Sequence, residues 1–440
     1  MRIKVNAVNV QKGMYVAQLD RSWLETPFLF QGFEVREDGE IGLLRKFCKH
    51  VYVDVERSTL EKNTILAAHK ATKAVNDPFN QTQRLRAAPK AITIPQKIIR
   101  AIGRLDPTGT IMDRLNRPKQ YKNIVTTAEE APRATTAYET AMEQVHEVLD
   151  NIKNGAGIKL DTIENAVTPM VDSVLRNQNA MAWLVYLRKQ DEYAYNHAVA
   201  TSVWAVIMGR HLGFDRHSLN TLAMGGILLD VGKTKIPDSI INKEGSLTQE
   251  ESAVMDMHVD YGVELAQDIP GINDDILKMI ECHHERHDGS GYPKGLEGAD
   301  IPVYGRIAGV VDCYDAMISN RPHRPARSSY DAVRELNLMV GTKFQKQLIE
   351  QFVQALGMFP TGSLVELNTG EVAIVIEQNR VRRLRPKVML LLDRDKQFFR
   401  SSKMLDLQKV PCDEGQRRAR WIVHGHEAGA FDINPKDYFL

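Results

Sequence analysis

The chain has 440 residues, enough for two or three domains, and its 57 Lys and Arg residues balance 56 Asp and Glu residues to a net charge of +1. This balance excludes a strong overall field for duplex nucleic acid or an anionic membrane surface, so any phosphate recognition must be local. The four scattered cysteines form no CxxC pair, and no apolar run approaches the roughly 18 residues needed to span a bilayer, so we expect a cytoplasmic protein without a membrane span.

Residues 1–75 are expected to form a small β-containing domain of unknown role. Two stretches alternate apolar and polar residues as half-buried strands do, at Ile3, Val5 and Ala7 and at Val51, Val53 and Val55. No recognisable chemistry lies in this part of the chain. The sequence does not choose between regulation, signal binding and dimerisation, so a homodimer is one assembly that stays open.

A change of composition marks the next part of the chain. Residues 76–135 are charged and rich in Pro, Thr and Ala, which favours a linker. Residues 136–359 then show apolar side chains at the spacing of amphipathic helices, for example at Ala141, Val145, Val148 and Ile152. This pattern predicts a helical main domain.

The pattern changes again after Pro360, and residues 360–440 predict a β-rich C-terminal extension. A turn at Asn368-Thr369-Gly370 separates the strand-like runs SLVEL and EVAIVIE, and KVMLLLD follows. The expected fold class is therefore mostly α, with a helical main domain and β-containing parts at both ends.

Polar residues that could carry chemistry first appear in the helical part. His197 lies in the first turn of an apolar helix, and Asp230 follows the apolar run 223–229 at a spacing of three from Lys233. Alone, His197 could be satisfied at its helix start and Asp230 could be paired with Lys233, because a buried unpaired charge is costly. His258 is unremarkable in isolation.

The stretch ECHHERHDGSGYPKGL changes this interpretation. Adjacent His283 and His284 follow an amphipathic helix and precede a glycine-rich loop that contains Tyr292. Such a loop lets the backbone approach a ligand closely, while the aromatic ring offers a stacking face. Four imidazoles and a carboxylate from separate helices suit a closed site for Fe, Mn, Zn or Ni rather than Mg.

A further stretch, RIAGVVDCYDAMISNRPHR, adds acidic and basic groups. Asp312 and Asp315 end an apolar helix face, and Arg321 and Arg324 follow at a spacing of three. Paired guanidinium groups bind phosphate well, because their forks match the phosphate oxygens. The alternative for these arginines is a solvated position at a helix end.

Over roughly residues 180–360 the sequence resembles the HD-GYP family, a branch of the HD-domain metal-dependent phosphohydrolases. The resemblance rests on HHERHDGSGYP, on DCYDAMISNRPHR and on GKTKIPDSIINKEGSLTQEE. The N-terminal GMYVAQLDRSWLETPFLFQGF is similar to a domain of uncharacterised role that often precedes this family. The resemblance implies a helical HD-type bundle that hydrolyses cyclic di-GMP, to the linear dinucleotide or to GMP, at a centre of two or three metals.

The resemblance also implies a role for each matching residue. The implied metal ligands are His197, Asp230, His258, His283, His284 and Asp312. Asp230 would bridge two metals, and Lys233 beside it would contact the substrate phosphate or the attacking water. The second phosphate would be held by Arg321 and Arg324. The name-giving loop would shape the nucleotide pocket and could contact diguanylate cyclase proteins, through Gly291, Tyr292 and Pro293.

Two positions depart from the family pattern. The family has His-Asp where this chain has Leu229-Asp230, and leucine has no lone pair for a metal. Members with three metals carry glutamate where this chain has Tyr193, so we expect two divalent metal ions. A site that keeps His197, Asp230 and Asp312 could still hold a metal, but the missing imidazole should cost at least about 10–100-fold in affinity.

These observations lead to one expected function and an open alternative. We expect a cyclic di-GMP phosphodiesterase that is weakened by Leu229. The alternative is a receptor or interaction module that binds cyclic di-GMP, or a diguanylate cyclase, without turnover. A different nucleotide substrate within the same superfamily also stays open, whereas a purely structural role for all four histidines is the least favoured interpretation.

Overall fold

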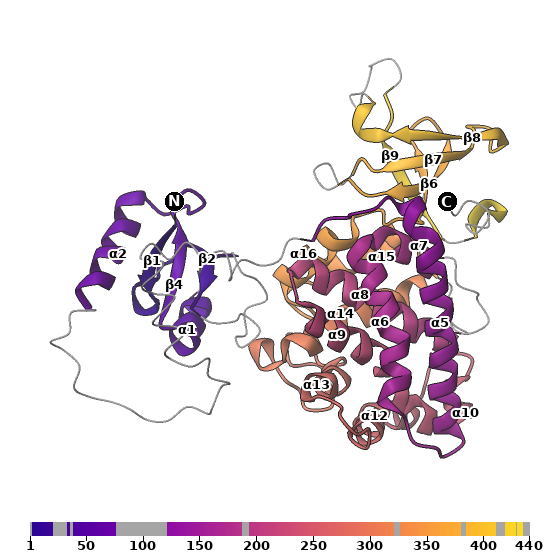
Figure 1. Cartoon of the computed structure of the whole chain (residues 1–440), viewed down its shortest axis with the longest axis horizontal. Coiled ribbons are helices and arrows are strands. Elements are labelled where there is room, and N and C mark those ends of the chain that lie inside the picture. The colour runs from indigo at the N-terminus through magenta and orange to yellow at the C-terminus, as the bar shows by residue number, and fades with distance from the viewer. Residues whose placement is uncertain are drawn as a thin grey trace. The chain divides into compact units, whose positions relative to one another are not determined.

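The computed structural model describes residues 2–20, 33–35, 38–75, 121–186, 193–320, 326–379, 384–410, 419–427 and 429–433. The chain folds as two compact units, Met1–Lys119 and Gln120–Leu440, each with its own buried apolar residues (Figure 1). The predicted fold class, mostly α with β-containing parts at both ends, is confirmed.

The first unit contains an antiparallel sheet with the strand order β1-β4-β2-β3. Its elements are β1 (Arg2–Asn6), β2 (Tyr15–Leu19), β3 (Phe33–Glu34), α1 (Asp38–Phe47), β4 (His50–Asp54) and α2 (Lys62–Val75). The two stretches of alternating apolar residues seen in the sequence form β1 and β4, which pair with each other. Val5 pairs with Val51 and Ile3 with Val53, and all four side chains are buried. The alternation in the sequence therefore reports one buried face of this sheet.

The second unit is a helical bundle followed by a sheet (Figure 1). Its helices are α5 (Thr127–Lys153), α6 (Leu160–Arg176), α7 (Gln178–Tyr186), α8 (Tyr193–Leu212), α9 (Arg216–Leu228), α10 (Asp238–Ile241), α11 (Gln249–Asp256), α12 (His258–Gln267), α13 (Asp274–Cys282), α14 (Val303–Ile318), α15 (Ser329–Leu338) and α16 (Lys346–Leu356). A short 3-10 turn, η4 (Val231–Lys235), follows α9. Helix α8 is buried along almost its whole length, which makes it the central helix of the bundle.

Helix α5 begins at Thr127, whereas the sequence analysis expected a linker up to residue 135. A capping box defines this start: the Thr126 hydroxyl accepts from the Glu129 amide, and the Glu129 carboxylate accepts from the Thr126 amide. Glu130 is fully buried and forms an ion pair with Arg176 of α6 at 2.7 Å. The alanines that suggested a linker are therefore helix formers packed against a neighbouring helix.

Helices α8 and α9 approach each other backbone to backbone. A Cβ added to Gly226 would lie 2.5 Å from the Ser202 Cα, so only glycine fits there. The Thr201 hydroxyl donates to the Gly226 carbonyl oxygen at 2.9 Å across this contact. The close approach fixes the end of α9, and with it Asp230, beside the first turns of α8.

The C-terminal strands form a second antiparallel sheet with the order β8-β7-β6-β5-β9. They are β5 (Leu364–Leu367), β6 (Val372–Glu377), β7 (Lys387–Leu392), β8 (Phe398–Asp406) and β9 (Ile422–His426). The turn predicted at Asn368-Thr369-Gly370 joins β5 to β6, and Gly370 has a φ of +84°, which favours glycine. Tyr330 of α15 stacks on Phe359 at the sheet's apolar cluster, which ties the sheet to the bundle.

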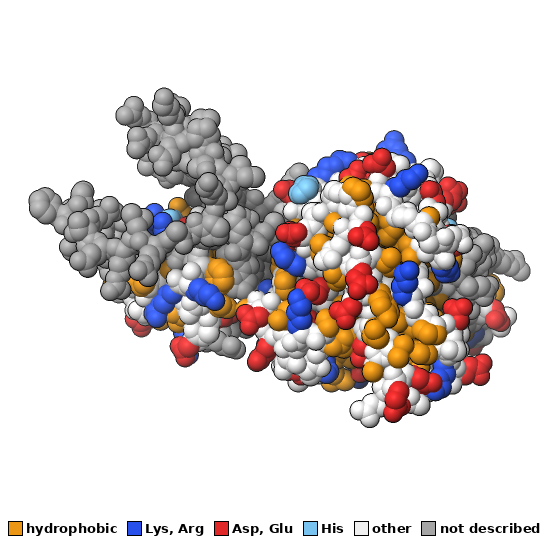
Figure 2. Space-filling model, turned by 90° about the horizontal axis from the view of Figure 1, so that it is seen from below, with side chains coloured by type: hydrophobic (Ala, Val, Ile, Leu, Met, Phe, Trp, Pro, Cys, Tyr) orange, Lys and Arg blue, Asp and Glu red, His pale blue; other side chains and the backbone are white. Residues whose placement is uncertain are grey.

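The surface of the second unit carries charges of both signs. Figure 2 shows Lys and Arg side chains interspersed with Asp and Glu on the visible face, without a broad field of one sign. This mixture agrees with the net charge of +1. Across the described parts of the chain, every helix is too short or too polar to cross a bilayer.

Candidate metal centre

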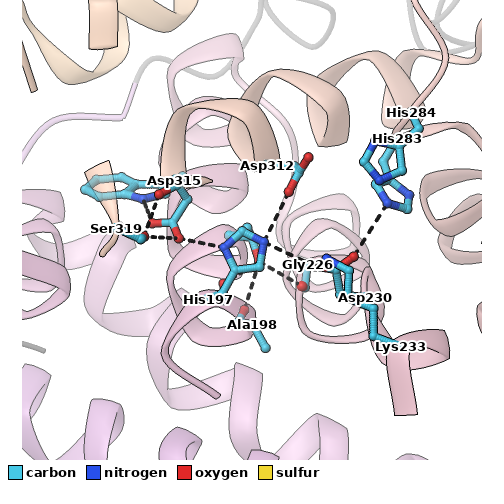
Figure 3. Close-up of polar contacts among 12 residues, drawn as sticks. His197, Ala198, Gly226, Asp230, Lys233, His283, His284, Asp312, Asp315 and Ser319 are labelled. Atoms are coloured by element: carbon cyan, nitrogen blue, oxygen red, sulfur yellow. Dashed lines mark hydrogen bonds and ion pairs between the residues drawn. The ribbon is translucent and has the colours of Figure 1, made fainter. Parts of the chain in front are cut away.

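Six side chains from several parts of the bundle converge at one place. Figure 3 shows His197, Asp230 and Asp312 near the adjacent His283 and His284. His197 comes from the first turns of α8, Asp230 from the junction of α9 and η4, and Asp312 from α14. The remaining three come from the start of α12 and the end of α13, as His258, His283 and His284. The structure thus brings together every residue that the sequence analysis proposed as a metal ligand.

Gly232 explains why Asp230 and His258 meet. A Cβ at this position would lie 1.9 Å from the His258 carbonyl oxygen and 2.4 Å from the Gly262 nitrogen. The backbone of η4 therefore packs directly on the first turns of α12. This contact is possible only because Gly232 lacks a side chain, whereas a Cβ on Gly262 would crowd Ile280 Cγ2, at 2.9 Å, rather than Gly232.

Asp230 lies between two sets of donors. Its Oδ2 lies 3.4 Å from His197 Nε2, and its Oδ1 lies 3.4 Å from His258 Nε2 and 3.8 Å from His283 Nε2. Oδ1 is buried and accepts no hydrogen bond. Within each set the donor atoms lie within 4.8 Å of one another, and the two sets are Asp230, His258, His283 and His284, and His197, Asp230 and Asp312. A carboxylate that faces both sets has the geometry of a bridging ligand.

The histidine set has its lone pairs pointing at one another. His258 Nδ1 donates to the Met255 carbonyl oxygen and His283 Nδ1 to the Ile280 carbonyl oxygen, both at 2.7 Å. Each neutral ring therefore keeps an unprotonated Nε2. These two Nε2 atoms are 3.3 Å apart, and His284 Nε2 lies 3.2 Å from that of His258. Facing lone pairs repel, so this set fits a shared cation.

The protonation of these rings favours metal binding at neutral pH. Burial, with neighbouring His258, lowers the pKa of His283 to about 4. Burial and the adjacent His283 also lower the pKa of His284 well below its usual value. Both rings are therefore neutral at pH 7, which is the form that binds metals.

The second set surrounds His197 with carboxylates. His197 Nε2 lies 3.1 Å from Asp312 Oδ1, and its Nδ1 donates to Asp315 Oδ2 at 2.7 Å (Figure 3). Burial tends to lower the pKa of His197, but Tyr193 and the three carboxylates together raise it well above the usual value. The contact with His197 in turn lowers the pKa of Asp312 despite burial. These acidic groups require a positive charge, which either a proton or a metal on Nε2 supplies.

Asp315 belongs to the site, although the sequence analysis did not include it among the site residues. It accepts the His197 Nδ1 proton while Asp312 faces Nε2, which is the arrangement of a carboxylate that orients a metal-binding imidazole. The spacing of three from Asp312 puts both on neighbouring surface of α14, and that spacing was the available signal.

The two departures from the family pattern border the His197 set. Leu229 is buried next to Asp230 and contributes no donor atom. Tyr193 stacks on His197, with ring centroids 5.3 Å apart and an angle of 14° between the rings. The described part of this set therefore contains one imidazole, whereas the other set contains three.

Lys233 lies at the edge of the centre. Its Nζ donates to Asp230 Oδ2 at 2.5 Å, and its side chain is 32% exposed. Burial tends to lower the pKa of Lys233, but Asp230, with Tyr193 and Asp312, raises it. Lys233 is therefore a charged donor that bonds to Asp230 and is also accessible from solvent.

The loop after His284 is folded against the histidine set. A Cβ at Gly291 would lie 2.4 Å from the Arg286 nitrogen, so the loop returns close to its own start. The Tyr292 ring stacks on His284 at 4.7 Å and precedes Pro293. Burial, with nearby Asp256, raises the pKa of the Tyr292 phenol. Its hydroxyl is therefore protonated at neutral pH and its ring forms a wall of the site.

Glu285 holds this loop in place. It is buried, and its carboxylate accepts from the amides of Lys294 and Leu296 at 2.8 and 2.9 Å. Glu285 was not among the site residues expected from the sequence. Arg321 and Arg324, the expected phosphate ligands, lie outside the described residues.

Comparisons with protein families divide the chain into recognised segments. The HD domain family matches residues 180–348, which include every residue of both donor sets. A domain of unknown function (DUF3391) matches residues 2–163. A KOW domain associated with the HD domain matches residues 364–411, which contain strands β5 to β8.

Individual relatives agree with these matches. The chain is 28% identical to cyclic di-GMP phosphodiesterase PA4108 of Pseudomonas aeruginosa, over 94% of this chain and 89% of that protein. It is 40% identical to 3'3'-cGAMP-specific phosphodiesterase 2 of Vibrio cholerae, over 29% of this chain and 24% of that protein. Among solved structures it is similar to Bd1817, an HDG"Y"P protein from Bdellovibrio bacteriovorus, with 16% identity and a TM-score of 0.43, covering 80% of this chain and 98% of that one.

The HD-domain match coincides with the part of the chain that forms the His and Asp cluster. The nearly full-length relationship to the Pseudomonas protein extends the likeness through both flanking regions. Residues 180–348 therefore form an HD domain, and the similarity to cyclic di-GMP phosphodiesterases supports the resemblance to the HD-GYP family.

Proposed function

We propose that this chain is a metal-dependent phosphodiesterase that hydrolyses cyclic di-GMP, with activity lowered by Leu229. The observation that carries the proposal is the shared position of Asp230 between two metal-competent donor sets. Divalent metals bound in such pairs act as Lewis acids and activate water for attack on phosphorus. The donor set of imidazoles and carboxylates favours Fe, Mn, Zn or Ni.

In this proposal the described residues have two roles, metal binding and contact with the substrate or the attacking water. His258, His283 and His284 would hold one metal with Asp230, and His197, Asp230 and Asp312 would hold the other. Lys233 donates a hydrogen bond to a non-bridging phosphate oxygen or orients the attacking water, because its charged Nζ is partly exposed beside Asp230. No other described lysine pairs with Asp230, so Lys233 is the candidate for this contact.

The remaining proposed contacts position the nucleotide. The Tyr292 ring, held against His284, offers a stacking face to a base, and Gly291 and Pro293 shape the loop that carries it. We propose Arg321 and Arg324 as ligands of the second phosphate from their spacing in the sequence. The same loop is the proposed contact for diguanylate cyclase proteins.

The substrate class is proposed from the relatives. The Pseudomonas protein is named a cyclic di-GMP phosphodiesterase, whereas the Vibrio protein is named specific for 3'3'-cGAMP. Cyclic di-GMP is the first candidate, because the Pseudomonas protein, which is named a cyclic di-GMP phosphodiesterase, matches almost the full length of this chain. Both cyclic dinucleotides belong in the assay, with linear dinucleotide and GMP measured as separate products.

The test is hydrolysis by the full chain loaded with Mn²⁺ or Fe²⁺. Asp230→Asn should remove turnover, because it weakens both donor sets at once. Asp260→Asn, an exposed position on α12, is the matched control and should leave the rate unchanged. Absence of turnover in the wild-type chain with both metals bound would contradict the proposed activity.

A second candidate function is a receptor that binds cyclic di-GMP without cutting it. Leu229 favours this candidate, since it leaves the His197 set with a single imidazole. A receptor would bind the dinucleotide in a metal-dependent manner and release it unchanged. Turnover that disappears in Asp230→Asn would exclude this candidate.

A further inference from the structure

Asp315 is held by donors from two helices. It is fully buried, and its Oδ2 accepts from His197 Nδ1 at 2.7 Å. The single Ser319 hydroxyl proton is shared between the Asp315 main-chain carbonyl oxygen, at 2.5 Å, and Oδ2, at 3.1 Å. Its Oδ1 accepts from the Trp204 indole Nε1 at 3.1 Å. One carboxylate oxygen thus faces the imidazole, and the other is fixed by the indole.

Trp204 is itself held rigidly by its surroundings. It lies on α8 about two helical turns after His197, so both side chains project from the same side of the helix. The indole is fully buried, packs edge-on against Tyr314 with centroids 5.6 Å apart, and lies 5.8 Å from the Tyr186 ring. The two tyrosine hydroxyls are 2.7 Å apart, and Ser329 donates to that of Tyr186 at 2.8 Å. The indole N–H therefore has one fixed direction, toward Asp315.

The two donor sets are supported in different ways. In the histidine set, His258 and His283 are oriented by main-chain carbonyl oxygens. In the His197 set, the single imidazole is oriented by the Asp315 side chain, which depends on Trp204 and Ser319. A substitution of Trp204 can therefore alter metal binding at the His197 set without altering metal binding at the histidine set.

We propose that Trp204 is a positioning residue for the His197 metal position, acting through Asp315. The indole fixes the carboxylate, the carboxylate fixes the tautomer and orientation of His197, and Nε2 is thereby presented to the metal together with Asp230 and Asp312. Because Leu229 supplies no imidazole, this position depends on the orientation of His197 more strongly than the position with three histidines. The inference rests on the metal centre of the proposed function and extends it to a residue remote from the metals.

The test compares metal binding by the full chain and its Trp204→Phe variant. Phenylalanine keeps an aromatic ring and removes the N–H donor. Metal content per chain is measured by mass spectrometry over a series of buffered free Mn²⁺ concentrations, without nucleotide. We expect two binding steps in the wild type. In the variant, the weaker binding step should need about 10–100-fold more free Mn²⁺, as when an outer partner of a metal ligand is lost. The free Mn²⁺ concentration of the other step should not change.

Two further variants separate positioning from loss of packing. Trp183→Phe changes another fully buried tryptophan, on α7, and should lower the melting temperature without shifting either binding step. Ser319→Ala removes the hydroxyl whose proton is shared between the Asp315 main-chain carbonyl oxygen and its carboxylate, so it should shift the same binding step as Trp204→Phe by a smaller factor. If Trp204→Phe does not fold, the binding curve of Ser319→Ala tests the inference in its place.

Equal binding curves for the wild type and Ser319→Ala or Trp204→Phe would overturn the inference. A parallel weakening of both steps would also overturn it, because that result indicates a general loss of packing. Failure of the proposed function is distinguishable: a chain that binds two metals but releases no product fails the hydrolysis assay while the selective shift persists. A wild-type chain that binds no metal overturns both.

Discussion

Leu229 stands where the HD-GYP pattern has a histidine. It continues the helical conformation of α9 and is almost fully buried beside Asp230. Leu229→His should restore an imidazole near the His197 set and raise Mn²⁺ affinity at that position by at least about 10-fold, with a higher hydrolysis rate. Metal titration and product release measure the two effects.

Leu228→His is the matched control for this change. Leu228 is equally buried but lies one residue earlier on the helix, about 100° around its axis, so its ring would project elsewhere. We expect this variant to lose stability without a gain in metal affinity. Equal behaviour of the two variants, or no gain in Leu229→His, would mean that position 229 does not face the metals.

The resemblance to the HD-GYP motifs implied the ligands, but the hydrogen bonds that orient those ligands could not be predicted from the sequence. The histidines and aspartates were identifiable because they occur in motifs with fixed spacing. The roles of Asp315 and Glu285 depend on which donors the folded chain brings to them, namely an indole from α8 and two loop amides. The indole is 111 residues from Asp315 in the sequence, and the two amides, 9 and 11 residues from Glu285, reach it only through the fold of the loop. The sequence pattern alone could not reveal these partners.

At the scale of elements, the contact between η4 and α12 positions the centre. Gly232→Ala would push a methyl group into the His258 carbonyl and the Gly262 amide, and backbone cannot move away as a side chain can. The free energy of unfolding should fall by about 1–3 kcal/mol or more, as for overpacking of a core. Metal affinity of the histidine set should fall as well, because His258 moves with its backbone.

Denaturant unfolding and metal titration check this prediction. Gly157→Ala is the control, since a Cβ there meets no atom within 4 Å. It should change stability by less than about 1 kcal/mol and leave metal binding unchanged. A Gly232→Ala protein with wild-type stability and metal affinity would show that η4 tolerates a wider separation from α12.

The loop that carries Tyr292 gives a second prediction at this scale. Glu285→Ala removes the carboxylate that accepts two loop amides, so the loop should lose its fixed position against His284. We expect the dissociation constant for cyclic di-GMP to rise by about tenfold, the value of one hydrogen bond to a charged group. Metal content should stay the same, because carbonyl oxygens outside the loop orient His258 and His283.

Glu281→Gln tests whether any acidic group near this loop would have the same effect. Glu281 forms an ion pair with the Lys294 side chain, and both residues are partly exposed, so this pair should contribute at most about 1 kcal/mol. Nucleotide binding should therefore be unchanged in this variant. A loss of binding equal to that of Glu285→Ala would contradict a specific role for the Glu285 bonds to the main chain.

Elements with strong periodicity were predictable, whereas their ends were not. The alternation around Val5 and Val51 reported a real sheet face, and the turn at Gly370 was found from its residue types. The start of α5 was missed because a segment rich in Ala, Pro and Thr has the composition of a linker. Its helical state depends on a capping box and on burial of Glu130 against Arg176, and the ion pair joins residues far apart in the sequence.

At the scale of the molecule, the two units should respond differently to metal removal. All residues of both donor sets lie in the second unit. A metal present at 100 times its dissociation constant stabilises the folded state by about 2.7 kcal/mol. A chelator should therefore lower the melting temperature of the second unit by roughly 5 °C.

The transition of the first unit should not move under the same treatment. Calorimetry of the full chain with and without chelator measures both transitions, and Asp230→Asn, which weakens both donor sets, should show a smaller chelator effect. Equal shifts in both transitions would indicate metal binding outside the described centre. An unchanged second transition would indicate that the centre binds no stabilising metal.

The most direct test of the central claim is anomalous X-ray diffraction from crystals of the Mn²⁺-loaded chain. A two-metal centre should give two anomalous peaks, one on each side of the Asp230 carboxylate. One should lie among His258, His283 and His284, and the other between His197 and Asp312. Peaks away from Asp230, or no peak within bonding distance of it, would contradict the assignment of a two-metal centre.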